Sequence, residues 1–503
     1  MNPKAAKAFE AARAAHAEGR ARDAFELCRK ALKTAPNHPG ILGLGGAAAA
    51  MAGALDDAER WLKRAASAEP KSAQAAGNLA MLLHRKGDGA GALAALDRAL
   101  AVNPGETRLH YMQGVLRQQA GRLVEAGESY REAVRQQPGY AEAWFNLGTV
   151  EDALERPADA RKAYEKTLAL QPGNWGARYN LATALMKSGE AEAAIPVFEE
   201  VIRLQPDFAD ARVNLGNALQ DLGRYDAAIN TYEAALARKP DSREARYNLA
   251  RACQADGRHD ACIEVCDAML ARRVDDAGAL AFKAVALNDL GREAEAAFLV
   301  DMARFIMPVD IEVPQGYPDI AAFNRALEAH IMAHPTLQED PANHATRNGQ
   351  HTGELLAEPQ GPFAAFAAAV DKAVEAYIAH HGADPGHPFL ARPPADWRLT
   401  VWAVVMRAMG HQVAHIHPVA WLSGVYYARL PAVMAGDNPG REGWLEFGAP
   451  QPDLRPQRPS PLDWFEPKLG RLFLFPSYFY HRTVPFETDD TRISIAFDIL
   501  RSD

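Results

Sequence analysis

The chain has 503 residues, which is too long for one compact domain and predicts at least two folded parts. Its formal net charge of −9 excludes a strongly basic nucleic-acid-binding protein, because such a protein must neutralise phosphates. No uncharged apolar run reaches the roughly 18 residues of a membrane span, and the first helix lacks the apolar core of a secretion signal. We therefore expect a cytoplasmic protein without a membrane or nucleic-acid partner.

Proline and glycine recur at a spacing of 34 residues through the first part of the chain. Glycine ends a helix and proline prevents one from continuing, so each unit is predicted to contain two helices. About nine such units fit into residues 1–306. The prolines are Pro36, Pro70, Pro104, Pro138, Pro172, Pro206 and Pro240. The glycines are Gly19, Gly53, Gly87, Gly121, Gly189, Gly223, Gly257 and Gly291, with Glu155 as the exception.

The residues within the units carry a recognisable pattern. "AEAWFNLGTVEDAL" supplies Trp144, Leu147 and Gly148, and a later unit supplies Leu215 and Gly216 in the same places. This pattern resembles the tetratricopeptide repeat. The resemblance implies an all-α solenoid with a concave surface, because a single helix pair cannot bury its apolar face alone.

Asparagine recurs in the first helix of several units, and this column has two interpretations. The simpler one is that asparagine is common at this position of the repeat. The other is a ladder of amides along the inner groove, which would hydrogen-bond the backbone of a captured protein or peptide. The column consists of Asn78, Asn146, Asn180, Asn214 and Asn248.

The four cysteines lie in alanine-rich helical surroundings, and we expect buried thiols rather than disulfides or a metal site. They are Cys28, Cys253, Cys262 and Cys266.

The repeat ends near residue 307, and residues 307–503 are predicted to form one α+β domain. Segments 320–334 and 362–381 have helical spacing. Beyond residue 396 the sequence turns to short apolar runs separated by turn residues, which predicts a sheet-rich sandwich or barrel. The runs are "RLTVWAVVM", "WLSGVYYARL", "GWLEF", "RLFLFP" and "RISIAFDIL".

Histidines in "HQVAHIHP" are the first candidates for chemistry in this domain. If the segment is a strand, His415 and His417 point the same way and Pro418 ends the strand. A further histidine, His481, follows much later, and Arg492 and Ser494 then share one face of another predicted strand. Imidazoles from distant segments can form a metal site, although such a pair can also lie unligated on a surface.

The order of these residues resembles the iron(II)- and 2-oxoglutarate-dependent oxygenases, in a branch near the prolyl hydroxylases. The resemblance implies a double-stranded β-helix (jelly-roll) fold that uses Fe(II), 2-oxoglutarate and O2. It assigns His415 and His481 as iron ligands and Arg492 as the cation that binds the far carboxylate of 2-oxoglutarate. Ser494 and Tyr427 would donate further hydrogen bonds to the cosubstrate.

His417 departs from the family, because an aspartate or glutamate usually stands there. As the third ligand it would be neutral, and the site would lose one negative charge. Alternatively His417 points away and water completes the shell, or His411 takes its place.

These features predict a dioxygenase that hydroxylates a protein or peptide captured in the concave groove of the repeats. The alternative is a non-catalytic adaptor whose oxygenase-like domain has degenerated, and the unusual His417 favours this second hypothesis. The substrate, the hydroxylated residue and the oligomeric state do not follow from the sequence.

Overall fold

The computed structural model describes residues 2–339, 345–357, 361–434 and 438–502, without the side chains of 408 and 409. It separates into two compact units, Met1–Ala218 and Leu219–Asp503. No helix within the described ranges is long and apolar enough to cross a membrane.

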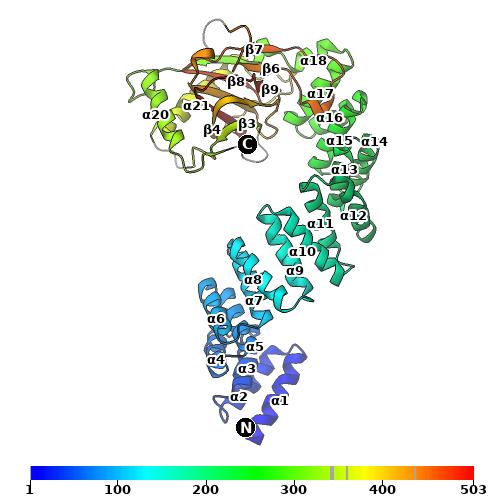
Figure 1. The fold of residues 1–503 in the computed structure, drawn as a ribbon, viewed down its shortest axis with the longest axis vertical. Coiled ribbons are helices and arrows are strands. Elements are labelled where there is room, and N and C mark those ends of the chain that lie inside the picture. The colour runs from blue at the N-terminus through cyan, green and yellow to red at the C-terminus, as the bar shows by residue number, and fades with distance from the viewer. Residues whose placement is uncertain (1, 340–344, 358–360, 435–437, 503) are drawn as a thin grey trace. The chain divides into compact units, whose positions relative to one another are not determined.

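Helix pairs fill the first unit and continue into the second, as predicted from the repeat (Figure 1). Among the described residues, eighteen helices form nine successive pairs, α1/α2 to α17/α18. The first unit contains α1 (Pro3–Ala17), α2 (Ala21–Leu32), α3 (Pro39–Met51), α4 (Leu55–Ala68), α5 (Ala73–Arg85), α6 (Gly89–Val102), α7 (Thr107–Gln119), α8 (Leu123–Gln136), α9 (Ala141–Ala153), α10 (Pro157–Leu170), α11 (Trp175–Lys187), α12 (Ala191–Leu204) and most of α13 (Ala209–Asp221). The second begins with α14 (Tyr225–Leu236), α15 (Arg243–Ala255), α16 (His259–Leu270), α17 (Ala277–Asp289) and α18 (Glu293–Leu299).

The recurring glycines lie in the turns between paired helices, as expected. All eight have φ between 71° and 85°, the left-handed region that glycine enters without steric cost. Glu155, the exception in the series, adopts the same conformation with φ of 57°. The turn geometry is therefore kept even where the sequence departs from glycine.

Other glycines allow the helices to approach closely. A Cβ atom on Gly148 would lie 2.6 Å from the ring of Tyr164, which is fully buried in the next helix. The predicted packing role of the cysteines is confirmed, because all four are buried free thiols.

The second unit continues with a strand-rich part. Both predicted helices and all five predicted strand runs are found there. Its elements are α19 (Met302–Phe305), β1 (Met307–Asp310), α20 (Ile320–Met332), β2 (Gln338–Glu339), β3 (Thr346–His351), α21 (Pro362–His381), β4 (Trp397–Gln412), β5 (Leu422–Arg429), η1 (Ala432–Met434), β6 (Leu445–Phe447), η2 (Pro452–Leu454), β7 (Asp463–Phe465), β8 (Arg471–Pro476), β9 (His481–Thr483) and β10 (Arg492–Arg501).

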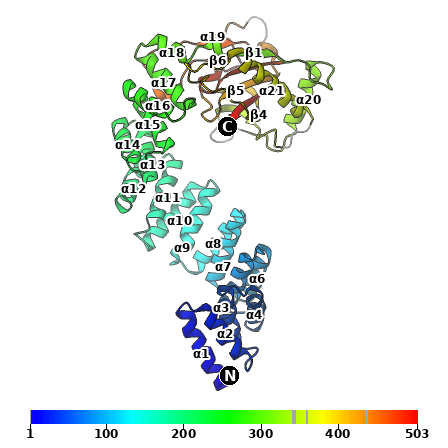
Figure 2. The same cartoon turned by 180° about the vertical axis from the view of Figure 1, so that it is seen from behind.

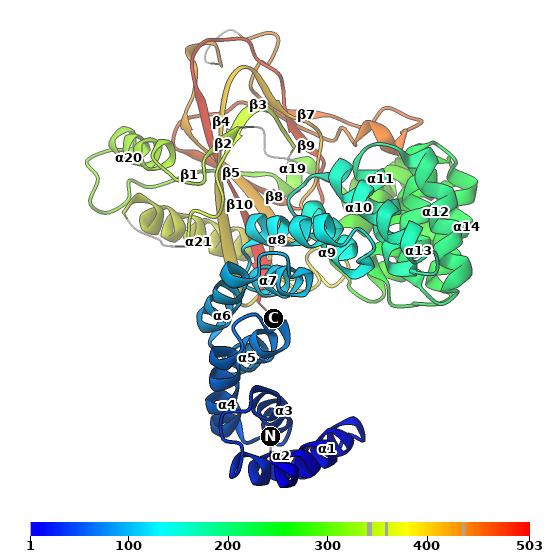
Figure 3. The same ribbon diagram turned by 60° about the horizontal axis from the view of Figure 1, so that its bottom comes forward.

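Two antiparallel sheets form this part, which confirms the predicted β-rich fold. The larger, curled sheet has the order β1-β8-β5-β10-β4-β3-β2, and the smaller has the order β7-β6-β9 (Figure 3). The sheets face each other, since Phe447 of β6 packs on Phe475 of β8 with 4.8 Å between ring centroids. Helices α20 and α21 cover the outer face of the large sheet (Figure 2), where Tyr426 donates a hydrogen bond to Asn324. The strand β10 lies between β5 and β4, near the centre of the large sheet.

The last helix pairs pack against the strand-rich part within the second unit. The carbonyl of Phe298, in α18, lies 2.9 Å from Nε2 of His387. Arg501 of β10 forms an ion pair of 2.8 Å with Asp275, just before α17. The helix pairs end at Leu299 and β1 begins at Met307. The domain limits of 1–306 and 307–503 remain a prediction, because contacts alone divide the chain after Ala218.

Candidate metal centre

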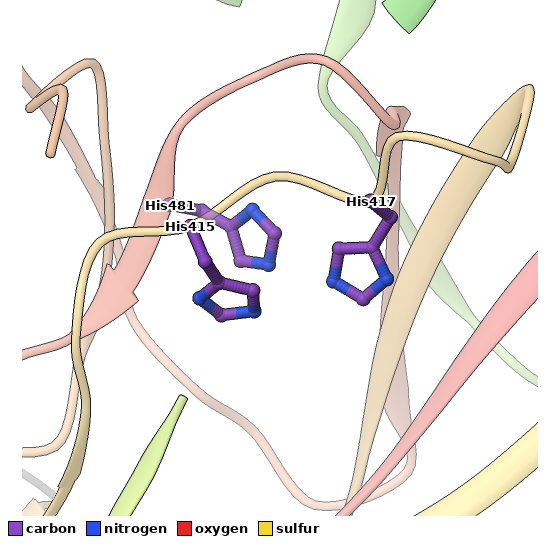
Figure 4. A group of neighbouring side chains, drawn as sticks. All are labelled: His415, His417 and His481. Atoms are coloured by element: carbon purple, nitrogen blue, oxygen red, sulfur yellow. The ribbon is translucent and has the colours of Figure 1, made fainter. Parts of the chain in front are cut away.

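Three histidines from two distant segments meet between the two sheets. His415 and His417 come from the loop after β4, and His481 opens β9. One ring nitrogen from each lies within 4.8 Å of the others, and Figure 4 shows the three rings grouped around a common space. This triad could hold a metal ion.

The strand predicted for His415 and His417 is wrong, because β4 ends at Gln412. The backbone leaves the large sheet there and crosses to the small one, where His415 and His481 exchange two backbone hydrogen bonds of 3.1 Å. The amide of His417 donates to the carbonyl of Ser477 at 2.9 Å. The rings of His415 and His417 still lie near each other, with 5.2 Å between centroids.

Backbone carbonyls fix the orientation of two of the rings. Nδ1 of His415 lies 2.8 Å from the carbonyl of Val413, and Nδ1 of His481 lies 3.0 Å from that of Phe479. A carbonyl oxygen can only accept, so Nδ1 carries the proton in both rings and donates it. The Nε2 atoms are left with free lone pairs, which is the form that binds a metal.

Burial also keeps these imidazoles neutral. Desolvation, assisted by the neighbouring imidazole of His417, lowers the pKa of His415 to about 4. Desolvation likewise holds the pKa of the buried His481 well below its usual value, and the other two histidines lower it further. Both rings are therefore neutral at neutral pH, with Nε2 unprotonated, as a metal ligand must be.

The third ring is supported by a carboxylate. Nδ1 of His417 donates to Asp498, with distances of 2.8 Å to Oδ1 and 2.9 Å to Oδ2. The hydroxyl of Ser423 donates to the same carboxylate at 2.6 Å. A carboxylate behind a histidine orients the ring and increases its basicity. Sequence reasoning missed Asp498, although its even spacing from Arg492 and Ser494 places all three on one face of β10.

Arg492, at the start of β10, is a buried cation. Its side chain is 1% exposed, donates to Ser494 at 3.2 Å and lies over the ring of Tyr427. Burial lowers the pKa of Arg492, and no carboxylate pairs with it in the described part of the chain. Arg492 Nε and the Tyr427 hydroxyl also lack a well-aligned hydrogen-bond partner among the described residues. Unsatisfied buried donors of this kind suit a carboxylate ligand.

The triad and Arg492 face the same space. One cavity is lined by all three histidines together with Arg492 and Ser494. A second, more open cavity adjoins it and shares Trp402, Gln412, His415 and His417 with it. Trp402 is stacked on the ring of His417, with 5.7 Å between centroids, so this side chain forms part of the wall between the two spaces.

The remaining candidates are placed as follows. Tyr426 and Tyr427 point to opposite faces of β5, and only Tyr427 reaches Arg492. Trp421 is a core residue that stacks on Phe389. His411 lies in β4 opposite Arg347 and is not part of the triad.

The asparagine column is partly buried and contacts tyrosines within the array. Asn146 donates to the hydroxyl of Tyr111 at 3.2 Å, and Asn214 donates to that of Tyr179 at 2.9 Å. Asn78, Asn180 and Asn248 are also partly buried. The bonds of Asn146 and Asn214 support the packing between successive repeats.

Comparison with known families identifies both parts of the chain. It belongs to the tetratricopeptide-repeat proteins, since matches to two tetratricopeptide-repeat families together span residues 15–276. Its C-terminal part is a member of the family described as "Putative 2OG-Fe(II) oxygenase". The match covers residues 400–498, and this range contains the triad and Arg492. No curated protein matches the chain.

Several solved repeat proteins resemble part of the chain. YrrB, titled a TPR protein with an unusual peptide-binding site, is 24% identical and covers 37% of this chain and 95% of its own, with a TM-score of 0.35. MamA is 25% identical over 34% of this chain and 93% of its own, with a TM-score of 0.33. A repeat protein from Cytophaga hutchinsonii is 16% identical over 48% of this chain and 99% of its own, with a TM-score of 0.42.

Proposed function

We propose that this chain is an iron(II)- and 2-oxoglutarate-dependent dioxygenase that hydroxylates a protein or peptide held by its repeats. The observation that carries the proposal is the shared cavity, in which three imidazoles face a buried guanidinium that has no carboxylate partner among the described residues. A metal alone would not require Arg492 there, and an anion alone would not require the triad. A dianionic cosubstrate that also binds a metal would use both.

The residues present fit iron(II). The Nε2 atoms of His415, His417 and His481 would hold it, and three positions would remain for cosubstrate and oxygen. Asp498 supplies behind His417 the negative charge that the family usually places on the metal itself. When bound, iron(II) and 2-oxoglutarate would supply oxidative decarboxylation to succinate and hydroxylation of a nearby C–H bond.

The far carboxylate of 2-oxoglutarate would be bound by Arg492, with Ser494 and Tyr427 as additional hydrogen-bond donors. Their burial strengthens these bonds and excludes water from this end of the cavity. The second cavity, on the other side of Trp402, would admit the substrate beside His415 and His417.

Capture of the substrate would fall to the repeats. A peptide tethered to the array experiences a high effective concentration at the active site, which lowers the affinity that the active site itself must provide. The column Asn78, Asn146, Asn180, Asn214 and Asn248 would contribute backbone contacts, alongside its bonds to tyrosines.

Succinate release tests the proposal without knowledge of the substrate. The protein is loaded with iron(II) in the absence of oxygen, and 2-oxoglutarate and air are then added. We expect a slow release of succinate. Zinc-loaded protein is the control, because zinc fills such sites but has no redox chemistry. If the iron-loaded protein neither binds nor converts 2-oxoglutarate, the dioxygenase proposal is wrong and the chain is better described as a non-catalytic adaptor.

Asp498→Asn is expected to weaken metal binding by about 10- to 100-fold, because outer-shell carboxylates typically contribute that much to affinity. Asparagine keeps the size of the side chain but removes the charge behind His417. Calorimetric titration with Mn²⁺ measures the change. Asp310→Asn is the control, since Asp310 pairs with Arg471 at the far edge of the sheet. Equal Mn²⁺ affinities in Asp498→Asn and the unmodified protein would exclude this role.

A further inference from the structure

A segment of the strand-rich part lies against the last repeats like a bound peptide. It follows β6, runs from Pro452 to Pro459 with the sequence "PDLRPQRP", and contacts α15 and α17. These are the first helices of their pairs, and α15 also carries Asn248 of the asparagine column. All of these residues belong to the second unit, and Figure 1 shows the segment in orange against the last repeats.

The segment's backbone is bound by one buried carboxylate. The amides of Gln457 and Arg458 both donate to Oδ1 of Asp289, each at 2.9 Å. Oδ2 of Asp289 accepts from Gln254 at 2.7 Å, and the Asp289 side chain is 0% exposed. A fully buried carboxylate needs such donors, and without the segment it would lose two of them.

Asn288 completes the backbone contacts. The side-chain amide of Asn288 donates to the backbone carbonyl of Pro459 at 3.3 Å. The backbone carbonyl of Asn288 accepts from the Arg458 side chain at 3.4 Å. Gln254 and Asn288 are 34 residues apart and therefore occupy equivalent places in successive repeats. Two adjacent repeats thus use a side-chain amide at the same position. Gln254 donates to Asp289, and Asn288 contacts the segment directly.

Side chains add specificity to the backbone contacts. Asp453 forms an ion pair with Arg251 of α15, and Arg455 lies over the ring of Tyr225. Leu454, between them, is fully buried. The segment therefore offers an acid, a buried apolar residue and arginines spaced by prolines.

The turns of the two repeats are shaped around the segment. A Cβ atom on Gly257 would lie 2.7 Å from the Gln457 side chain, and one on Gly291 would lie 2.5 Å from that of Arg458. Equivalent glycines of other repeats, such as Gly189 and Gly223, have nothing within 4 Å. Close contact at the turn therefore occurs where the segment passes.

We propose that α15 and α17 form a peptide-binding site whose ligand is the chain's own segment 452–459. The site recognises an extended peptide through its backbone amides, its acidic residue and its arginines. While the segment is bound, these two repeats, one of which carries Asn248, are closed to a foreign peptide. The repeats that carry the other four asparagines of the column must then capture any substrate. The proposal does not depend on the oxygenase activity, and its test involves no turnover.

Hydrogen exchange on the full chain tests the backbone contacts. In Asp289→Ala, the amides of Gln457 and Arg458 are expected to exchange more than about tenfold faster than in the unmodified protein. Asp221→Ala is the matched control, because Asp221 has the same repeat position as Asp289 two repeats earlier. Equal exchange in Asp289→Ala and the unmodified protein would overturn the proposal.

A second variant leaves the repeats unchanged. Asp453→Lys puts a cation opposite Arg251 and should release the segment. A fluorescent peptide with the sequence of residues 450–461 is then expected to bind this variant at least about tenfold tighter than the unmodified protein, where the tethered segment competes at high effective concentration. If the peptide binds both proteins equally, or neither, the site is not a peptide-binding site.

Discussion

His481→Ala is expected to abolish high-affinity metal binding and all succinate release. The variant removes one of the three proposed ligands, so the loss of affinity should exceed the roughly 10- to 100-fold that outer-shell partners contribute. His481 is also the only member of the triad from β9, and no other histidine among the described residues joins the cluster. Calorimetric titration with Mn²⁺ and the absorption spectrum of the Co²⁺-loaded protein measure the change.

His411→Ala is the control for this experiment. It removes an imidazole from β4, four residues before His415, and should leave metal affinity unchanged. If His411→Ala loses the metal and His481→Ala keeps it, the triad is misassigned.

Arg492→Met is expected to raise the KM for 2-oxoglutarate by about 100-fold and, at the same time, to stabilise the ligand-free protein. A charge-assisted hydrogen bond to a carboxylate contributes about 1.5–3 kcal/mol, which accounts for the loss of affinity. The guanidinium of Arg492 is buried without an anionic partner and therefore carries a desolvation cost. Methionine has a similar volume and avoids this cost, so the free energy of unfolding should rise by about 1 kcal/mol or more. Denaturant unfolding of the metal-free protein measures the second effect.

Arg482→Met provides a comparison of opposite sign. Arg482 pairs with the buried carboxylate of Glu446 at 2.7 Å, so its removal leaves a buried charge unpaired and should destabilise the protein. If Arg492→Met destabilises the protein as much as Arg482→Met does, Arg492 has a structural role rather than a ligand-binding one.

The 34-residue spacing was sufficient to predict the helix pairs and their turns, because each pair contacts mainly its neighbours in sequence. Strand parity was sufficient to place Arg492 and Ser494 on the same face of β10. The same rule would have found Asp498, had its even spacing from Arg492 been used.

Other features depend on contacts that no local pattern contains. The path of His415 follows from its backbone pairing with His481, 66 residues later, and this pairing draws the segment away from β4 toward the small sheet. The segment around Asp453 meets Arg251 across about 200 residues of sequence, and its prolines indicate only a loop. Spacing alone cannot predict such long-range partners.

The strand β10 has one more consequence. Its first residue is the proposed anion clamp and its seventh supports a proposed metal ligand, both on the inward side. A backbone slip of one position would turn the guanidinium and the carboxylate outward together, since neighbouring side chains alternate between the faces of a sheet. A mutation that shifts the register of this strand would therefore remove the anion-binding role of Arg492 and the support of His417 by Asp498 together.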